Sequence, residues 1–230
     1  MMIKRIAAIV FFTSVWSQSV AQYTVLNEVW LEAGTQAKMN DLSISLAEGF
    51  RIHEGSASQT YTELGLQYKV NKYLRFGAGY RFIQKPLLFS IYEYDHRFSF
   101  DAALSYKAGD IQFGFRPRYQ HRVNGISGDD GSRSKTYSRN KFSVEYSVSK
   151  QIGIKLNYEF FMRLASGDNF IDQNRYSIQG SYTIDKTHKF SLFYMLQQEI
   201  QVTWPQLTHV VGLEYSYNFK LGGDSSTEGK

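Results

Sequence analysis

The chain has 230 residues, a formal net charge of +5 and no cysteine. The lack of cysteine excludes a disulfide framework and a lipid-modified cysteine. The charge excess is too small to favour a nucleic-acid-binding protein. After the N-terminal region, no stretch is apolar for long enough to form a membrane-spanning helix.

The N-terminus predicts a secretory signal peptide over residues 1–21. Lys4 and Arg5 form a basic region, which is followed by a short apolar run, and Ala21 ends a group of small residues that fits a cleavage site. The alternative is a membrane anchor, but the apolar run is shorter than the roughly 20 residues that span a bilayer. We therefore expect an exported protein that is cleaved after Ala21.

The remainder divides into a domain at 22–220 and a Gly- and Ser-rich polar tail at 221–230, which we expect to be disordered. The domain alternates apolar and polar side chains. For example, Leu74, Phe76 and Phe82 share one phase, and Arg75 lies in the other. Such alternation is the period of a β-strand. It recurs in ten segments: 42–52, 61–70, 72–85, 97–106, 111–122, 142–148, 152–163, 175–184, 190–201 and 208–220.

The connections between these segments alternate in length. We expect short turns near Asn71, Ala108-Gly109, Lys150 and Asp185-Lys186, and longer polar links at 53–59, 84–92, 123–137, 165–171 and 202–206. A long meander with short turns at one end and long loops at the other is typical of a transmembrane β-barrel. The sequence therefore predicts an all-β fold, an up-and-down antiparallel barrel.

A soluble barrel or sandwich is the alternative, and it would point its apolar side chains inward. Two features favour the membrane barrel. The polar phase is rich in Gly, Ser and Gln, with mixed Arg and Glu. The apolar phase is rich in Phe and Tyr and carries tyrosine near strand ends, as a lipid-facing surface with aromatic girdles does. We expect a polar lumen lined by Arg and Glu, and an outer face in contact with lipid.

The strand count is open at ten to twelve. Residues 25–35 (VLNEVWLEAGT) also alternate and would make an eleventh strand, whereas bacterial single-chain barrels have even counts. This segment could instead pack in the lumen, or a further strand could lie within a loop. Glu48 interrupts an apolar phase and Pro117 cannot donate to a ladder, so either could mark a β-bulge.

The last segment contains GLEYSYNF at 212–219. Its spaced aromatics and final Phe resemble the terminal-strand signal that the outer-membrane assembly machinery reads, although here a polar tail follows. We expect this machinery and outer-membrane lipid to be the partners of the protein. We also expect the protein to be a monomer.

The order of several blocks is similar to a known family. These blocks are EVWLEAG (28–34), ISLAEGFRI (44–52), YTELGLQYKVNKYLRFGAGYRF (61–82), HRFSFDAALSYK (96–107), FRPRYQHR (115–122) and NRYSIQGSYTIDKTHKFSLFYMLQQE (174–199). Together they resemble the DUF2490 family, a domain of unknown function in outer-membrane-type proteins of Bacteroidota-like Gram-negative bacteria. The resemblance implies a barrel and export, and it carries over no catalytic residue.

Arginines of the polar phase concentrate toward the long loops. A mouth lined by one sign of charge attracts anions, and the guanidinium fork suits phosphate and carboxylate groups. One hypothesis is therefore an outward-facing basic vestibule for a small anionic solute. Its candidate residues are Arg51, Arg81, Arg97, Arg118, Arg122, Arg139, Arg163 and Arg175.

The alternative hypothesis is that these charges pack the interior as ion pairs, because small barrels fill their lumen with side chains. Cross-strand pairs of opposite charge stabilise sheets by roughly 0.2–1 kcal/mol each. The positions of the short turns predict four such pairs: Asp101 with Arg116, Glu145 with Lys155, Lys141 with Glu159 and Arg175 with Glu199.

We expect no enzyme, metal or cofactor. His96 and His209 share the outward phase, where some barrels act on lipids, but no nucleophile, base and orienting group come together. No His, Asp or Glu set has ligand spacing. The sequence thus predicts an outer-membrane barrel that is a small pore or a structural barrel of the envelope. The alternatives are a lipid- or glycan-modifying enzyme and a soluble periplasmic binding barrel.

Overall fold

The computed structural model describes residues 23–86, 91–125, 134–164 and 169–221. The expected signal peptide and nearly all of the polar tail lie outside these residues. Within them, no helix is both long and apolar enough to cross a membrane.

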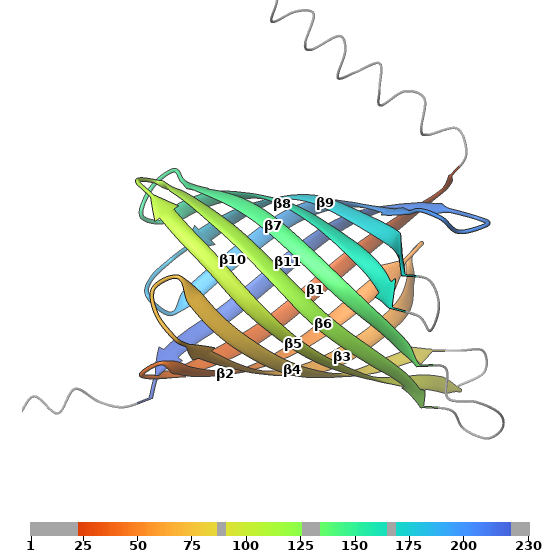
Figure 1. Cartoon of the computed structure of the whole chain (residues 1–230), viewed down its shortest axis with the longest axis horizontal. Coiled ribbons are helices and arrows are strands. Elements are labelled where there is room, and N and C mark those ends of the chain that lie inside the picture. The colour runs from red at the N-terminus through yellow and green to blue at the C-terminus, as the bar shows by residue number, and fades with distance from the viewer. Residues whose placement is uncertain (1–22, 87–90, 126–133, 165–168, 222–230) are drawn as a thin grey trace, which may run out of the picture.

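The described residues form eleven strands that close into one barrel, in which each strand is hydrogen-bonded to the next along the chain. The strands are steeply tilted (Figure 1). They are β1 (Thr24–Met39), β2 (Leu42–His53), β3 (Ser56–Lys69), β4 (Leu74–Pro86), β5 (Tyr92–Ala108), β6 (Ile111–Gly125), β7 (Lys135–Ser147), β8 (Ile152–Leu164), β9 (Phe170–Thr183), β10 (His188–Glu199) and β11 (Gln206–Lys220). The count lies within the expected range.

The odd number of strands determines how the barrel closes. In an up-and-down meander of eleven, the first and last strands run in the same direction, so β1 pairs with β11 in parallel, from Thr24–Gln206 to Lys38–Lys220. The other neighbouring pairs are antiparallel. The segment at 25–35 therefore belongs to the wall as part of β1 and is not packed inside the lumen.

The connections lie at two ends of the barrel, which we call the turn side and the loop side. The turn side carries the tight turns between β1 and β2 and after β3, β5, β7 and β9 (Figure 1). Side chains hold several of these turns. Asn71 Oδ1 accepts hydrogen bonds from the Tyr73 and Leu74 amides. Asp185 Oδ1 accepts from the Thr187 hydroxyl and from the Thr187 and His188 amides, and these hydrogen bonds lower the pKa of the Asp185 carboxyl to about 2.

One loop-side connection is shorter than the sequence analysis predicted. Residues 53–59 were expected to form a long link, but only Glu54 and Gly55 separate β2 from β3. Both have positive φ, 47° and 80°, as a two-residue hairpin turn requires. The sequence signal was weak because the first turn position is Glu and not the usual Asn or Asp.

Neither expected bulge is present at its predicted position. The β2–β3 register is unbroken through Glu48, whose carboxylate accepts a hydrogen bond of 2.7 Å from Thr62 Oγ1 on the outer face. The β6–β7 register is likewise continuous through Pro117. Register shifts occur instead between Arg51 and Ile52 and between Phe161 and Met162.

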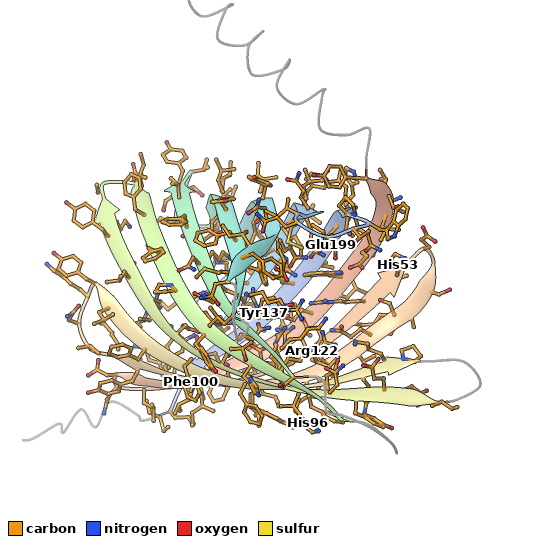
Figure 2. All side chains as sticks on the ribbon, turned by 45° about the vertical axis from the view of Figure 1, so that its right-hand side comes forward. His53, His96, Phe100, Arg122, Tyr137 and Glu199 are labelled. Atoms are coloured by element: carbon orange, nitrogen blue, oxygen red, sulfur yellow. The ribbon has the colours of Figure 1, made fainter. Side chains whose placement is uncertain are left out.

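The barrel is apolar outside and polar inside. Large apolar side chains are exposed on the outer face of every strand, among them Phe100 and Leu192, each 60% exposed (Figure 2). Arg139, Glu159, Gln120 and other polar side chains are buried. This distribution is the reverse of that in a soluble protein, whose buried residues are mostly apolar.

Aromatic rings fill the interior where glycine leaves room. The Tyr61 ring lies where a Cβ on Gly49 would be, and the Phe193 ring occupies the equivalent space over Gly212. The Tyr61 hydroxyl also donates a hydrogen bond to Glu32. These two glycines therefore allow large rings to lie over the neighbouring strand inside the lumen, and a side chain at either position would displace the ring.

Candidate functional site in the barrel interior

The interior holds a central cavity of about 310 Å³ that is lined by side chains from all eleven strands. Only the lumen of a closed barrel can be reached from every strand, so this cavity lies inside it. Its lining includes seven arginines and Lys141, against four glutamates. The site is thus strongly cationic and lies along the barrel axis.

Two further polar cavities lie on either side of the central one. A loop-side cavity of about 250 Å³ is lined by residues near the loop-side strand ends, such as Ile83 and Arg122. A turn-side cavity of about 180 Å³ is lined by residues near the opposite ends, such as Arg75 and Gln112. The three cavities therefore follow one another from the loop side to the turn side.

Among these three cavities, every residue that lines two of them is a cation. Arg51, Arg97, Arg139 and Arg175 line both the loop-side and the central cavity. Arg116 and Lys141 line both the central and the turn-side cavity. We call these sets the arginine boundary and the turn-side boundary. A solute that moved from one cavity to the next would pass guanidinium or ammonium groups.

Some of these cations have carboxylate partners. Arg139 makes a two-pronged pair with Glu159, with Nε–Oε1 and Nη2–Oε2 distances of 3.1 and 3.0 Å, and its Nη1 donates to Gln120. Arg118 donates two hydrogen bonds to Asp101, of 2.9 and 2.6 Å. Both Arg118 bonds go to Oδ2, whereas the Arg139–Glu159 pair uses both carboxylate oxygens, an arrangement that is strong and fixes the orientation of the guanidinium plane.

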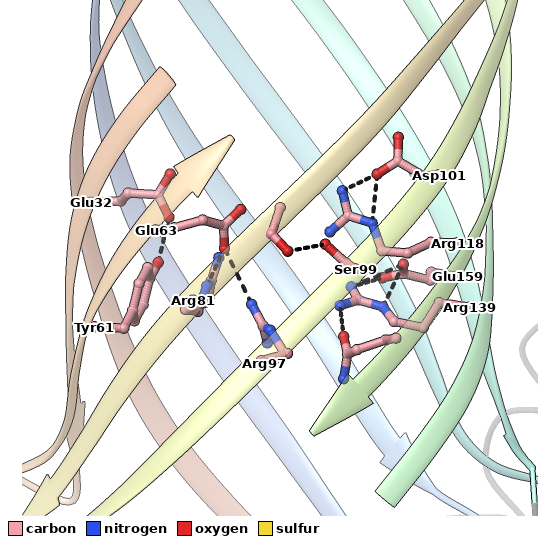
Figure 3. A network of polar contacts seen from close by, with 12 residues as sticks. Glu32, Tyr61, Glu63, Arg81, Arg97, Ser99, Asp101, Arg118, Arg139 and Glu159 are labelled. Atoms are coloured by element: carbon pink, nitrogen blue, oxygen red, sulfur yellow. Dashed lines mark hydrogen bonds and ion pairs between the residues drawn. The ribbon is translucent and has the colours of Figure 1, made fainter. Parts of the chain in front are cut away.

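Glu63 serves two arginines. It is paired with Arg81, and its Oε2 lies 3.3 Å from Arg97 Nη2 (Figure 3). Arg81 and Arg97 are direct cross-strand partners, an arrangement that is destabilising for like charges. The shared carboxylate offsets this repulsion.

A second shared carboxylate lies nearer the loop side. Asp95 has no exposed surface and pairs with Arg122 and with Lys85, whose Nζ is 2.9 Å away. Lys85 also lies 3.6 Å from Glu93. This cluster neutralises the charge of Arg122, which the sequence placed among the candidates for anion attraction.

Two arginines of the arginine boundary rest on aromatic faces instead. Arg51 Cζ lies 3.7 Å from the centroid of the Trp30 ring, and Arg175 Cζ lies 4.4 Å from that of Phe161 and 5.8 Å from that of Trp30. Among the described residues neither has an ion pair, and the Nε atom of each is buried without a hydrogen-bond partner.

Of the four expected ion pairs, one is present and two are wrong. In the fourth, the two residues face each other across the strands but form no ion pair. Glu145 faces Lys155 across the β7–β8 ladder, at 3.1 Å. Lys141 faces Glu159 as expected, but the ion pair of Glu159 is with Arg139.

The two wrong pairs are each displaced by two residues. Asp101 faces Arg118 and not Arg116, because the β5–β6 turn is Gly109-Asp110, one residue later than expected. Arg175 faces Gln197 and Glu159, while Glu199 faces Gln173. A two-residue error keeps each side chain on its face, so these residues still point inward.

The eight arginines expected at the outward mouth are distributed through the depth of the lumen. Arg51, Arg97, Arg139 and Arg175 form the arginine boundary, and Arg81 and Arg118 line the central cavity. Arg122 lines the loop-side cavity, and Arg163 lies 6.0 Å from the Phe170 ring near the loop-side strand ends. The basic region is therefore a belt across the lumen more than a vestibule at its mouth.

Sequence reasoning missed the aromatic residues of the site. Trp30, Tyr61 and Phe161 all point inward and contact arginines, at 3.7 Å for Arg81 over Tyr61 and 4.4 Å for Arg139 over Phe161. The sequence does contain a sign of this orientation, because Tyr61 and Phe161 alternate in step with the polar residues of their strands. That sign was not used, because apolar side chains of a membrane barrel are expected to face outward.

The outward histidines pair with tyrosines. His96 Nδ1 lies 2.8 Å from the Tyr80 hydroxyl, and His209 Nδ1 lies 2.6 Å from the Tyr194 hydroxyl. In the described part of the chain no three His, Cys, Asp or Glu residues form a metal-binding group. The geometry of the histidines fits an aromatic girdle.

Comparison with known proteins supports the family expected from the sequence. The family model described as a protein of unknown function, DUF2490, matches residues 27–206, which include β1 to β10 almost entirely. The chain belongs to the DUF2490 family. No curated protein matches this DUF2490 chain at a significant level. The family description assigns no activity, so the function has to be argued from the barrel itself.

Proposed function

We propose that this DUF2490 protein is a monomeric outer-membrane barrel that passes small anions through its cationic lumen. Its membrane placement is supported by the outer surface, which exposes Phe and Leu side chains over the whole wall. Contiguous apolar surface on this scale is rare in soluble monomers and marks a lipid-contacting face. An open apolar hollow of about 820 Å³ on that surface, lined by Leu104, Phe113 and Phe142 among others, fits lipid acyl chains.

The pore function rests on one observation: both boundaries between neighbouring cavities consist of cations only. Cationic constrictions in a low-dielectric wall attract anions and repel cations. The small volumes of the three cavities predict a low conductance for small ions.

We expect purified protein in planar bilayers to conduct with selectivity for chloride over potassium. The double substitution Arg116→Gln and Lys141→Gln should shift the reversal potential in a KCl gradient toward cation permeation, because it removes both charges of the turn-side boundary. Among the described residues neither side chain has an ion pair, so no carboxylate is left unpaired.

Arg75→Gln is the matched control. Arg75 lines the turn-side cavity but not a boundary, so its loss should change the reversal potential much less. If the wild-type protein shows no conductance at any voltage, the pore is refuted and a structural barrel of the envelope remains. If Arg75→Gln changes selectivity as much as the double substitution, the boundaries do not set it.

A further inference from the structure

The arginine boundary contains two guanidiniums that form no ion pair among the described residues. Arg97 and Arg139 are paired with Glu63 and Glu159, whereas Arg51 and Arg175 have no ion pair among the described residues. The nearby Glu28 attracts both guanidiniums from a distance, but its contacts are with Trp30 Nε1, which donates to it at 2.6 Å, and with His53 Nδ1, 3.6 Å away. Two buried guanidiniums without an ion-pair partner destabilise the fold unless a bound anion neutralises them.

The guanidiniums of Arg51 and Arg175 both lie near the Trp30 ring. Arg51 and Arg175 approach the Trp30 centroid to 3.7 and 5.8 Å, so their Cζ atoms are at most about 9.5 Å apart, the sum of these distances. Stacking on Trp30 and Phe161 restricts both side chains. Both also line the loop-side and the central cavity, so each guanidinium borders open space. The two groups are thus ordered in advance beside a volume that a ligand can fill.

We propose that Arg51 and Arg175 form a binding site for a doubly charged oxyanion of the phosphate type. Two guanidiniums that lack an ion pair favour a dianion over a monoanion, and guanidinium forks match phosphate and sulfate oxygens. The Nε atom of each arginine is buried without a hydrogen-bond partner, so the protein leaves part of the donor capacity of both guanidiniums unused. This inference deepens the proposed function, because it names the class of anion that stops within the lumen.

The test is calorimetric titration of the folded full-length protein in detergent with inorganic phosphate at pH 8, where phosphate is mainly a dianion. We expect saturable one-to-one binding, with acetate at least about tenfold weaker. Arg51→Lys and Arg175→Lys keep the charge but lose the fork, and each should weaken phosphate binding roughly ten- to hundredfold. Arg75→Gln should stay within about twofold of the wild type.

Trp30 reports where the phosphate binds. The chain has three tryptophans, of which Trp16 lies in the expected signal peptide, so Trp204→Phe in the processed protein leaves Trp30 alone. Its fluorescence should change with the same dissociation constant as the calorimetric signal. The site is refuted if phosphate does not bind, if acetate binds equally well, if Arg75→Gln weakens binding as much as Arg51→Lys, or if Trp30 does not respond.

Circular dichroism and heat-modifiable gel mobility establish that each variant is folded, so that a lost signal can be interpreted. The proposal of a phosphate site and the proposal of a pore can be refuted independently. A barrel that conducts anions but binds no phosphate refutes the site alone, and one that binds phosphate without conducting refutes the pore alone.

Discussion

Replacing Arg139 with Gln is expected to lower the free energy of unfolding by about 3–5 kcal/mol, as for other buried ion pairs that lose one partner. The side chains of Arg139 and Glu159 are each only 9% exposed, and both carboxylate oxygens of Glu159 accept hydrogen bonds from the guanidinium. After the substitution, Glu159 would keep a buried charge without this partner. Denaturant titration of the protein folded in lipid vesicles measures the change.

Two variants separate this explanation from general damage to the lumen. The double substitution Arg139→Gln and Glu159→Gln removes both charges, so it should recover much of the loss. Arg116→Gln removes a boundary arginine that has no ion pair among the described residues and faces Lys141, so it should be neutral or stabilising. A loss of several kcal/mol in Arg116→Gln, equal to that in Arg139→Gln, would contradict the pairing account.

The second large effect is expected on the outer face. Phe100 lies midway along β5 and is 60% exposed, opposite Ala78 and Tyr119 on the neighbouring strands. If this face contacts hydrocarbon, Phe100→Arg should destabilise the barrel by about 2–4 kcal/mol, the cost of arginine at the bilayer midplane. The same vesicle-based denaturant titration measures it.

Tyr106→Arg is the matched control. Tyr106 lies on the same strand and face, is 58% exposed, and is close to the turn-side end. The cost of a charge falls to about 0–1 kcal/mol near the membrane interface, so Tyr106→Arg should be tolerated. Equal and small effects at the two positions would be expected of a water-exposed surface and would contradict a membrane-embedded one.

Much of the fold follows from the sequence because strand alternation is a strong local signal. Every expected segment lies within, or largely within, a strand of the barrel, and the segment at 25–35 proved to be part of the wall. The parallel closure of β1 on β11 could not be read locally, since it depends on the parity of the whole meander. The bulge at Ser58, opposite Arg51 and Ile52, was also missed, because residues 53–59 were expected to form a loop.

The candidate site was predicted in part. Alternation identifies which arginines point inward, and that inference survives an error of two residues in register. The same error changes the predicted cross-strand partner of a residue, so Asp101 was assigned to Arg116 and not to Arg118. The stacking of Arg51 on Trp30 depends on which β1 residue faces which β2 residue, and the sequence alone does not provide this register.

The central claim is that the apolar face meets lipid and the arginine-bearing face encloses water. Because the chain has no cysteine, single spin labels can be attached at Phe100→Cys on the outer face and at Gln67→Cys, which lines the turn-side cavity. In vesicles, we predict that the label at position 100 collides mainly with oxygen dissolved in lipid, and the label at position 67 with a water-soluble nickel chelate. The reverse pattern, or nickel access at both positions, would contradict the account.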